Sequence, residues 1–203
     1  MEVASLLTAF ITLFVVIDPP GLAPLFVALT RGETTQHRRA VGLRACITGG
    51  ALLALFGLFG EAVLGFAGIS LPAFRIAGGI LLFLTALDML FERRTKRRRD
   101  QSSNADDPSI FPLATPLIAG PGAIATMILL TGEAGDDLAA NIAVYLILLS
   151  LIVLVFITFL AAGLIERVLG PTGINVVTRL LGMLLAALSV QFVIDGFMAV
   201  IPT

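Results

Sequence analysis

Two short polar and helix-breaking motifs interrupt otherwise apolar stretches of this 203-residue chain. The first motif is Asp18-Pro19-Pro20-Gly21, and the second comprises Thr115-Pro116 followed by Gly120-Pro121-Gly122. Proline removes a backbone donor and clashes with the preceding helical turn, and glycine weakens a helix interior. Each motif therefore predicts that one helix ends and another begins, which leaves free carbonyl groups on one side of the break and free N–H groups on the other.

Free helix ends of this kind could bind a small charged solute. A helix N-terminus carries partial positive charge and suits a carboxylate, whereas the carbonyl end suits an ammonium group or a cation. Two facing breaks could therefore hold both charged groups of a zwitterion such as an amino acid. The candidate substrate-binding residues are Asp18, Pro19, Pro20, Gly21, Thr115, Pro116, Gly120, Pro121 and Gly122.

Asp18 is the one acidic residue well inside an apolar stretch. An acid at the centre of a membrane helix costs about 3 kcal/mol, so it is a functional candidate by default. It could bind an ammonium group or carry a coupling proton. It could equally be a helix N-cap that precedes Pro19 at the first helical position, and one residue could fill both roles. Weaker candidates, which could line a cavity or bond to a neighbouring helix, are Thr85, Ser189 and Gln191.

The composition indicates the elements that position these motifs. Hydrophobic residues make up 58% of the chain and charged residues 13%, with a mean hydropathy of +1.03. A soluble domain is about 45–50% apolar and about 25% charged, so a soluble enzyme, a disordered chain and a nucleic-acid-binding module are excluded. A bilayer span needs about 20 apolar residues. Six stretches meet that need, at residues 4–29, 40–65, 71–91, 110–131, 139–165 and 176–200. We predict an all-α membrane protein with six transmembrane helices, of which the first and fourth are broken.

Basic residues predict the orientation of these spans. If all six stretches cross the bilayer, every Lys and Arg of the 13 in the chain except Arg75 lies on one side. The positive-inside rule makes that side cytoplasmic, so both termini are expected outside. In a rival topology, spans one and four are re-entrant hairpins, and Arg75, Arg167 and Arg179 then share a side. The topology with six crossings gives the more unequal distribution of Lys and Arg between the two sides, so we prefer it.

An internal repeat divides the chain into two halves of three spans. Residues 1–91 form the first half, residues 92–109 a basic cytoplasmic linker, and residues 110–203 the second half. At a shift of about 101–105 residues, the matching segments are 20–21 with 121–122, 61–65 with 166–170, 68–70 with 173–175, and 75–78 with 179–182. Because three is an odd number, the second copy must cross in the opposite sense, which is the inverted-repeat architecture of many secondary transporters. We also expect a Glu–Arg pair in each half, Glu61 with Arg75 and Glu166 with Arg179.

Other chemistries find little support in the sequence. The chain has one cysteine, Cys46, and one histidine, His37, so a metal site is not expected. It has no phosphate-binding loop of the P-loop type, which disfavours transport driven by ATP through this chain alone. No serine or histidine lies beside Asp18, so we expect no catalytic residue, no cofactor and no enzymatic activity.

Three segments resemble signatures of the MarC family of bacterial and archaeal inner-membrane proteins. They are Phe14 to Gly21 with Pro24 and Phe26, Arg75 to Met89, and Pro112 to Ile124. The resemblance covers nearly the whole chain and implies a six-span protein that is grouped with neutral amino acid transporters. It implies small substrates such as glycine and alanine.

Together these observations predict a secondary transporter of small neutral amino acids that works by alternating access, with Asp18 as the candidate for proton coupling. The expected partners are a small zwitterionic solute and the lipid bilayer of a bacterial or archaeal cytoplasmic membrane, with no nucleic acid. A homo-oligomer is compatible with the small residues on the helices. The alternatives are efflux or permeation of another small solute, and a membrane protein without a transport cycle.

Overall fold

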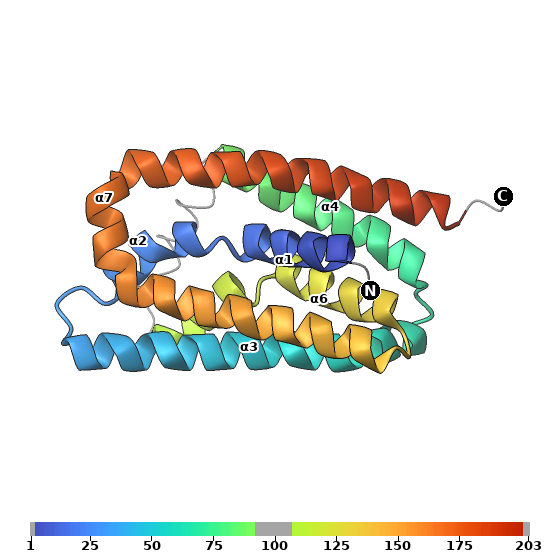
Figure 1. Ribbon diagram of the computed structural model, residues 1–203, viewed down its shortest axis with the longest axis horizontal. Helices are drawn as coiled ribbons and strands as arrows, with labels where there is room; N and C mark the ends of the chain where they lie inside the picture. Colours follow the sequence, from blue (N-terminus) through green and yellow to red (C-terminus); the bar gives the residue numbers. More distant parts are fainter. Residues whose placement is uncertain (1–2, 92–106, 201–203) are drawn as a thin grey trace.

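The structure, a computed structural model, describes residues 3–91 and 107–200, and this part of the chain is helical apart from short connections (Figure 1). The elements in chain order are α1 (Val3–Ile17), α2 (Pro19–Leu29), α3 (Thr35–Phe66), α4 (Leu71–Leu90), η2 (Ser109–Ile118), α6 (Pro121–Ala134) and α7 (Leu138–Met198). Most of the predicted linker, residues 92–106, lies outside the described residues.

Long apolar helices confirm the membrane class. Three single helices, α3, α4 and α7, and the segment Ser5–Leu29 are long and apolar enough to cross a bilayer, and η2 with α6 forms one further candidate that is bent by 56°. Large apolar side chains also recur at helical spacing on the exposed face of α7. These side chains are Leu138, Ile142, Leu146, Leu149, Val153, Ile157, Leu160 and Leu164. Such a stripe is unfavourable in water and suits contact with lipid chains.

The broken segments lie inside the helical bundle. In Ser5–Leu29 the most apolar window is 61% buried, whereas the corresponding windows of α3, α4 and α7 are 28–33% buried. Helix α6 contacts α1, α3, α4 and α7, so it is surrounded by protein. Backbone that leaves helical geometry at membrane depth must be buried in protein or line a wet cavity. The surrounding helices therefore bury the non-helical backbone of the two breaks.

The predicted spans 139–165 and 176–200 both lie in α7, in which two helices meet at a kink. Only Gly170 leaves helical geometry within it, with φ 62° and ψ 176°. Pro171 disfavours helical geometry at the residue before it, and glycine alone readily adopts the positive φ found here. The chain reverses direction near this point, so the later part of α7 returns along the bundle (Figure 1).

Gly170→Ala is expected to destabilise the fold by about 1–3 kcal/mol, because an L side chain is strained at this positive φ. The measurement is the thermal unfolding midpoint of the detergent-purified protein. Gly163→Ala is the matched control, since Gly163 is a helical residue of α7 and a Cβ atom added to it would meet no atom within 4 Å. Equal unfolding midpoints for the two variants would show that the turn does not require glycine at position 170.

Small residues allow α4 to pack closely on the later part of α7. A Cβ atom on Gly79 would lie 2.8 Å from the carbonyl oxygen of Ser189, and one on Gly182 would lie 3.3 Å from that of Ala86. Larger side chains at these two positions would push the helix backbones apart. The contact is the close approach that small residues permit between membrane helices.

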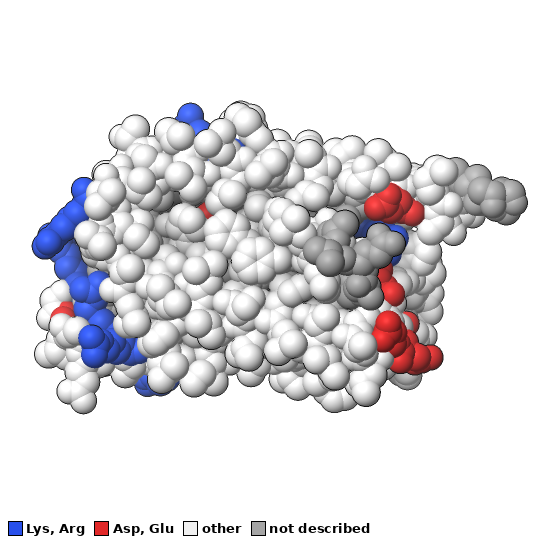
Figure 2. All heavy atoms as spheres, in the orientation of Figure 1, with Lys and Arg blue, Asp and Glu red and all other residues white. Residues whose placement is uncertain are grey.

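Charged residues separate towards the two ends of the bundle (Figure 2). At the junction of α2 and α3 the chain carries Arg31, Arg38, Arg39 and Arg44. At the junction of α6 and α7 it carries Glu133, Asp136 and Asp137. We call these the basic end and the acidic end. The basic run 93–99 lies outside the described residues.

Candidate functional site

The first break is organised by Asp18. This residue has a left-handed backbone, with φ 56° and ψ 62°, and separates α1 from α2. Its Oδ1 atom accepts a hydrogen bond from the backbone N–H of Gly21 at 3.1 Å, so Asp18 is the N-cap of α2 and Pro19 is the first helical residue. The side chain is fully buried, at 0% exposure. The break therefore places a carboxyl group inside the bundle rather than at a lipid or water surface.

Gly21 leaves the space that this carboxyl group occupies. A Cβ atom at Gly21 would lie 2.0 Å from Oδ2 of Asp18. Any larger residue would force the carboxyl group out of its capping position. Three residues of the motif therefore have a defined structural role: Asp18 is the cap, Pro19 is the first helical residue, and Gly21 makes room for the carboxyl group.

The second break has a different construction. Within η2, Thr115 is extended, with φ −127° and ψ 130°, and its hydroxyl group donates to the carbonyl oxygen of Ile110 at 3.3 Å. Helix α6 then begins at Pro121 with Gly120 as its N-cap, and no side chain makes a capping hydrogen bond there. A Cβ atom on Gly120 would lie 2.6 Å from the carbonyl oxygen of Pro116, so the chain folds back tightly on itself.

The two breaks therefore differ in charge. A carboxyl group caps the start of α2, whereas no side-chain acceptor caps the start of α6. The exposed partial positive charge of a helix N-terminus favours an anion. One break consequently suits a cationic group and the other an anionic group.

The structure brings the start of α6 against the end of α1. A Cβ atom at Gly122 would lie 3.2 Å from Cγ1 of Val16, which is two residues before Asp18. The same position would lie 3.1 Å from Cδ2 of Leu82 and 3.6 Å from Oγ1 of Thr85. Gly122 is thus enclosed by α1 and α4, and there is little room for a side chain at this point.

Of the three weaker polar candidates, Thr85 joins this region, and its hydroxyl group donates to the carbonyl of Leu81 at 2.9 Å. The buried Thr126, which the sequence did not single out, also belongs here, because its hydroxyl group donates to the carbonyl of Gly122 at 2.8 Å. Ser189 donates to the carbonyl of Ala186 at 2.7 Å, and Gln191 donates to Asp195 at 2.7 Å, so both bond within α7. The sequence did not single out Val16 or Leu82, because apolar residues in an apolar span carry no signal of their own.

An ion pair joins the two halves of the chain at the acidic end. The guanidinium group of Arg75, near the start of α4, donates to Oε1 of Glu133, near the end of α6, at 2.6 Å. The expected pairing of Arg75 with Glu61 is therefore wrong. Glu133 is the available partner because α4 packs on α6, a tertiary contact that spacing along the chain does not reveal.

A double-mutant cycle is expected to give a coupling of about 1 kcal/mol between Arg75 and Glu133, since the pair is only partly buried. The variants are Arg75→Gln, Glu133→Gln and their combination, and the measurement is unfolding in detergent. Glu61→Gln is the control and should be additive with Arg75→Gln. Coupling of Arg75 to Glu61 rather than to Glu133 would contradict the observed pairing.

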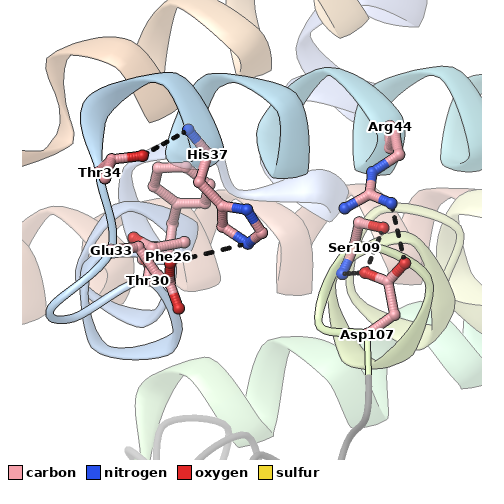
Figure 3. A network of polar contacts seen from close by, with 8 residues as sticks. All are labelled: Phe26, Thr30, Glu33, Thr34, His37, Arg44, Asp107 and Ser109. Carbon is pink, nitrogen blue, oxygen red and sulfur yellow. Dashed lines mark hydrogen bonds and ion pairs between the residues drawn. The ribbon is translucent and has the colours of Figure 1, made fainter.

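A second polar network fastens η2 to α3 at the basic end (Figure 3). Arg44 of α3 pairs with Asp107 at 3.2 Å, and Oδ1 of Asp107 accepts from the hydroxyl and backbone N–H groups of Ser109, at 2.6 and 2.9 Å. The hydrogen bonds from Ser109, with the charge of Arg44, lower the pKa of the Asp107 carboxyl group. Its carboxylate form therefore holds the first turn of the second broken segment in place.

A bundle of apolar helices around two interrupted segments defines a polytopic helical membrane protein. Residues 3–201 match the MarC family, described as "MarC family integral membrane protein". The chain belongs to this family. No solved structure matches the chain.

The relatives come from archaea and bacteria. A UPF0056 membrane protein of Archaeoglobus fulgidus is 38% identical over 97% of this chain and 95% of its own length. The UPF0056 membrane proteins YvbG of Bacillus subtilis and YhcE of Escherichia coli are 34% and 32% identical, over 100% and 95% of this chain and 98% and 92% of their own lengths. Their names state membrane proteins and give no substrate.

Proposed function

We propose that this protein is a secondary transporter of small neutral amino acids, such as glycine and alanine, and that it works by alternating access. The observation that carries the proposal is that the start of α6 packs against the end of α1, with Gly122 beside Val16, so that two helix breaks with different capping lie on packed segments inside the protein. Paired broken spans in corresponding halves of a membrane protein are typical of transporter binding sites.

The proposal includes six membrane crossings. A straight helix of 61 residues, the length of α7, would extend for about 90 Å, or three times the hydrocarbon core of a bilayer. The reversal at Gly170 divides α7 into two crossings instead, and the other four are α1 with α2, α3, α4, and η2 with α6. Each broken pair leads from one end of the bundle towards the other in Figure 1, as expected for crossings rather than hairpins.

This topology implies a cytoplasmic basic end. The positive-inside rule favours the side that carries Arg31, Arg38, Arg39 and Arg44. The start of α1 and the end of α7 both lie towards the other end of the molecule (Figure 1), which supports termini outside the cytoplasm.

The two broken segments also support an inverted repeat. In Figure 1 the pair α1 and α2 runs opposite to the pair η2 and α6. In both pairs the second helix starts with proline, Pro19 or Pro121. Two copies inserted in opposite senses can exchange inward-facing and outward-facing arrangements, and this exchange is the physical basis of alternating access.

The chemistry of the breaks supports a zwitterionic substrate. The buried carboxyl group of Asp18 suits an ammonium group, and the start of α6 suits a carboxylate. Asp18 is also the candidate carrier of a coupling proton, because it is the buried acid at the break.

Uptake by proteoliposomes tests the proposal. Purified protein should accumulate labelled glycine or alanine above empty vesicles, with a dependence on an imposed proton gradient if coupling occurs through a proton. Unlabelled alanine should compete, and small solutes that lack an amino acid headgroup should not. No uptake with or without the gradient would contradict the proposal, and competition only by other solutes would favour their efflux or permeation.

A further inference from the structure

A pocket at the basic end is distinct from the helix breaks. Its volume is about 100 Å³, and it lies between the end of α2, the start of α3 and the middle of α7. The lining residues are Phe26, Thr35, Arg38, Arg39, Phe159 and Leu160. A buried water needs about 10–15 Å³ by a comparable measure, so the pocket has room for a polyatomic group.

The floor of the pocket is a rigid aromatic pair. The rings of Phe26 and Phe159 stack with centroids 4.4 Å apart and planes at 10°, and both side chains are almost fully buried. The hydroxyl group of Thr30 donates to the carbonyl of Phe26 at 2.7 Å, which ties down the end of α2 (Figure 3). The guanidinium carbon of Arg38 lies 5.7 Å from the centroid of the Phe26 ring. A cation–π contact therefore holds this guanidinium group at the pocket.

Arg38 and Arg39 give the pocket positive charge. In residues 3–91 and 107–200 the ion pairs are Glu33 with His37, Asp107 with Arg44, and Glu133 with Arg75, so neither pocket arginine has a carboxylate partner there. Helix α3 begins at Thr35, and its N-terminus adds partial positive charge. Among the described acids near this end, Asp107 pairs with Arg44 and Glu33 lies against the imidazole ring of His37, so the two guanidinium groups of the pocket suit an anion.

We propose that this pocket binds the phosphate group of an anionic phospholipid. Guanidinium groups match phosphate through parallel hydrogen bonds, and arginine is the preferred partner for that geometry. Leu160 is 51% exposed and belongs to the apolar stripe of α7 that we assign to lipid contact, together with Ile157 and Leu164. With its phosphate group in the pocket, a phospholipid can therefore place its acyl chains along the exposed apolar stripe of α7. The proposal is independent of amino acid transport.

Native mass spectrometry of the full-length protein tests this site. The probes are phosphatidylglycerol, phosphatidylcholine and inorganic phosphate, each added to delipidated protein in detergent. The test variant is the double mutant that carries both Arg38→Gln and Arg39→Gln. The control for a change of charge at the same end is Arg31→Gln, which lies outside the pocket. The basic run 93–99 is present in every protein, so its contribution is constant across the comparison.

The wild type and Arg31→Gln should retain one phosphatidylglycerol molecule in preference to phosphatidylcholine. The double variant should bind it about 25-fold more weakly, since each of its two lost arginines contributes about 1 kcal/mol near an anionic lipid, or about fivefold in affinity. Equal loss with Arg31→Gln, or equal retention of both lipids, would overturn the site. The wild type could instead bind inorganic phosphate without any preference for phosphatidylglycerol. That result would contradict a phospholipid as the ligand of the pocket. Unfolding midpoints of all three proteins report whether they remain folded.

Discussion

Asp18→Asn is expected to reduce amino acid uptake to the background of empty vesicles, while the protein still folds. Asparagine caps a helix as well as aspartate does and tolerates the left-handed backbone found at this position. The variant therefore keeps the hydrogen bond to Gly21 and the geometry of the break. It removes the negative charge proposed to bind the ammonium group and to carry a coupling proton.

Asp18→Ala serves as the structural comparison for this prediction. Loss of the capping hydrogen bond is expected to destabilise the alanine variant by about 1 kcal/mol, and the left-handed backbone by about 1–2 kcal/mol more. Its unfolding midpoint should fall, whereas that of Asp18→Asn should stay near the wild-type value. Wild-type uptake by Asp18→Asn would show that Asp18 is only a cap. Equal loss of stability in both variants would show that the charge itself supports the fold.

Gly120→Ala is expected to disrupt the second break and to lower uptake at least tenfold. A Cβ atom there would lie 2.6 Å from the carbonyl oxygen of Pro116, and a backbone oxygen cannot turn away as a flexible side chain can. The backbone of Gly120 has φ −82° and ψ 167°, which alanine adopts without strain, so the effect arises from lack of space. Overpacking of this kind costs about 1–3 kcal/mol.

Gly65→Ala is the control for Gly120→Ala. Gly65 lies in α3, and a Cβ atom added to it meets no atom within 4 Å. Uptake and unfolding should both remain at wild-type levels in this variant. If Gly120→Ala transported as well as Gly65→Ala, the tight turn between Pro116 and Pro121 would have no part in the transport cycle.

Much of the fold could be predicted from local features of the sequence. The span predicted at 71–91 matches α4, Leu71–Leu90, because apolar length is a property of the segment alone. The break at Asp18 was also predictable, since proline and glycine act on their own backbone. The helix α3 starts at Thr35, before the predicted 40, because its first turns are polar and extend beyond the apolar stretch.

The features that the sequence did not reveal depend on tertiary contacts. Arg75 pairs with Glu133 across the two halves, although Glu61 is nearer in the chain. Val16 and Leu82 enclose Gly122 through helix packing, and nothing in their residue types indicates this. The kink between the two helices of α7 lies at one residue of non-helical geometry, Gly170, and the apolar lengths of the two spans did not indicate that position.

Accessibility of the second break from each side of the membrane is the sharpest test of alternating access. The probe is Thr115→Cys in a Cys46→Ala background, which removes the one native cysteine. A membrane-impermeant maleimide is applied from one side or the other, with and without alanine. We expect labelling from both sides, in different conformations of one protein, at a rate that alanine changes. Labelling from one side only, at a rate that alanine does not change, would contradict alternating access at the helix breaks.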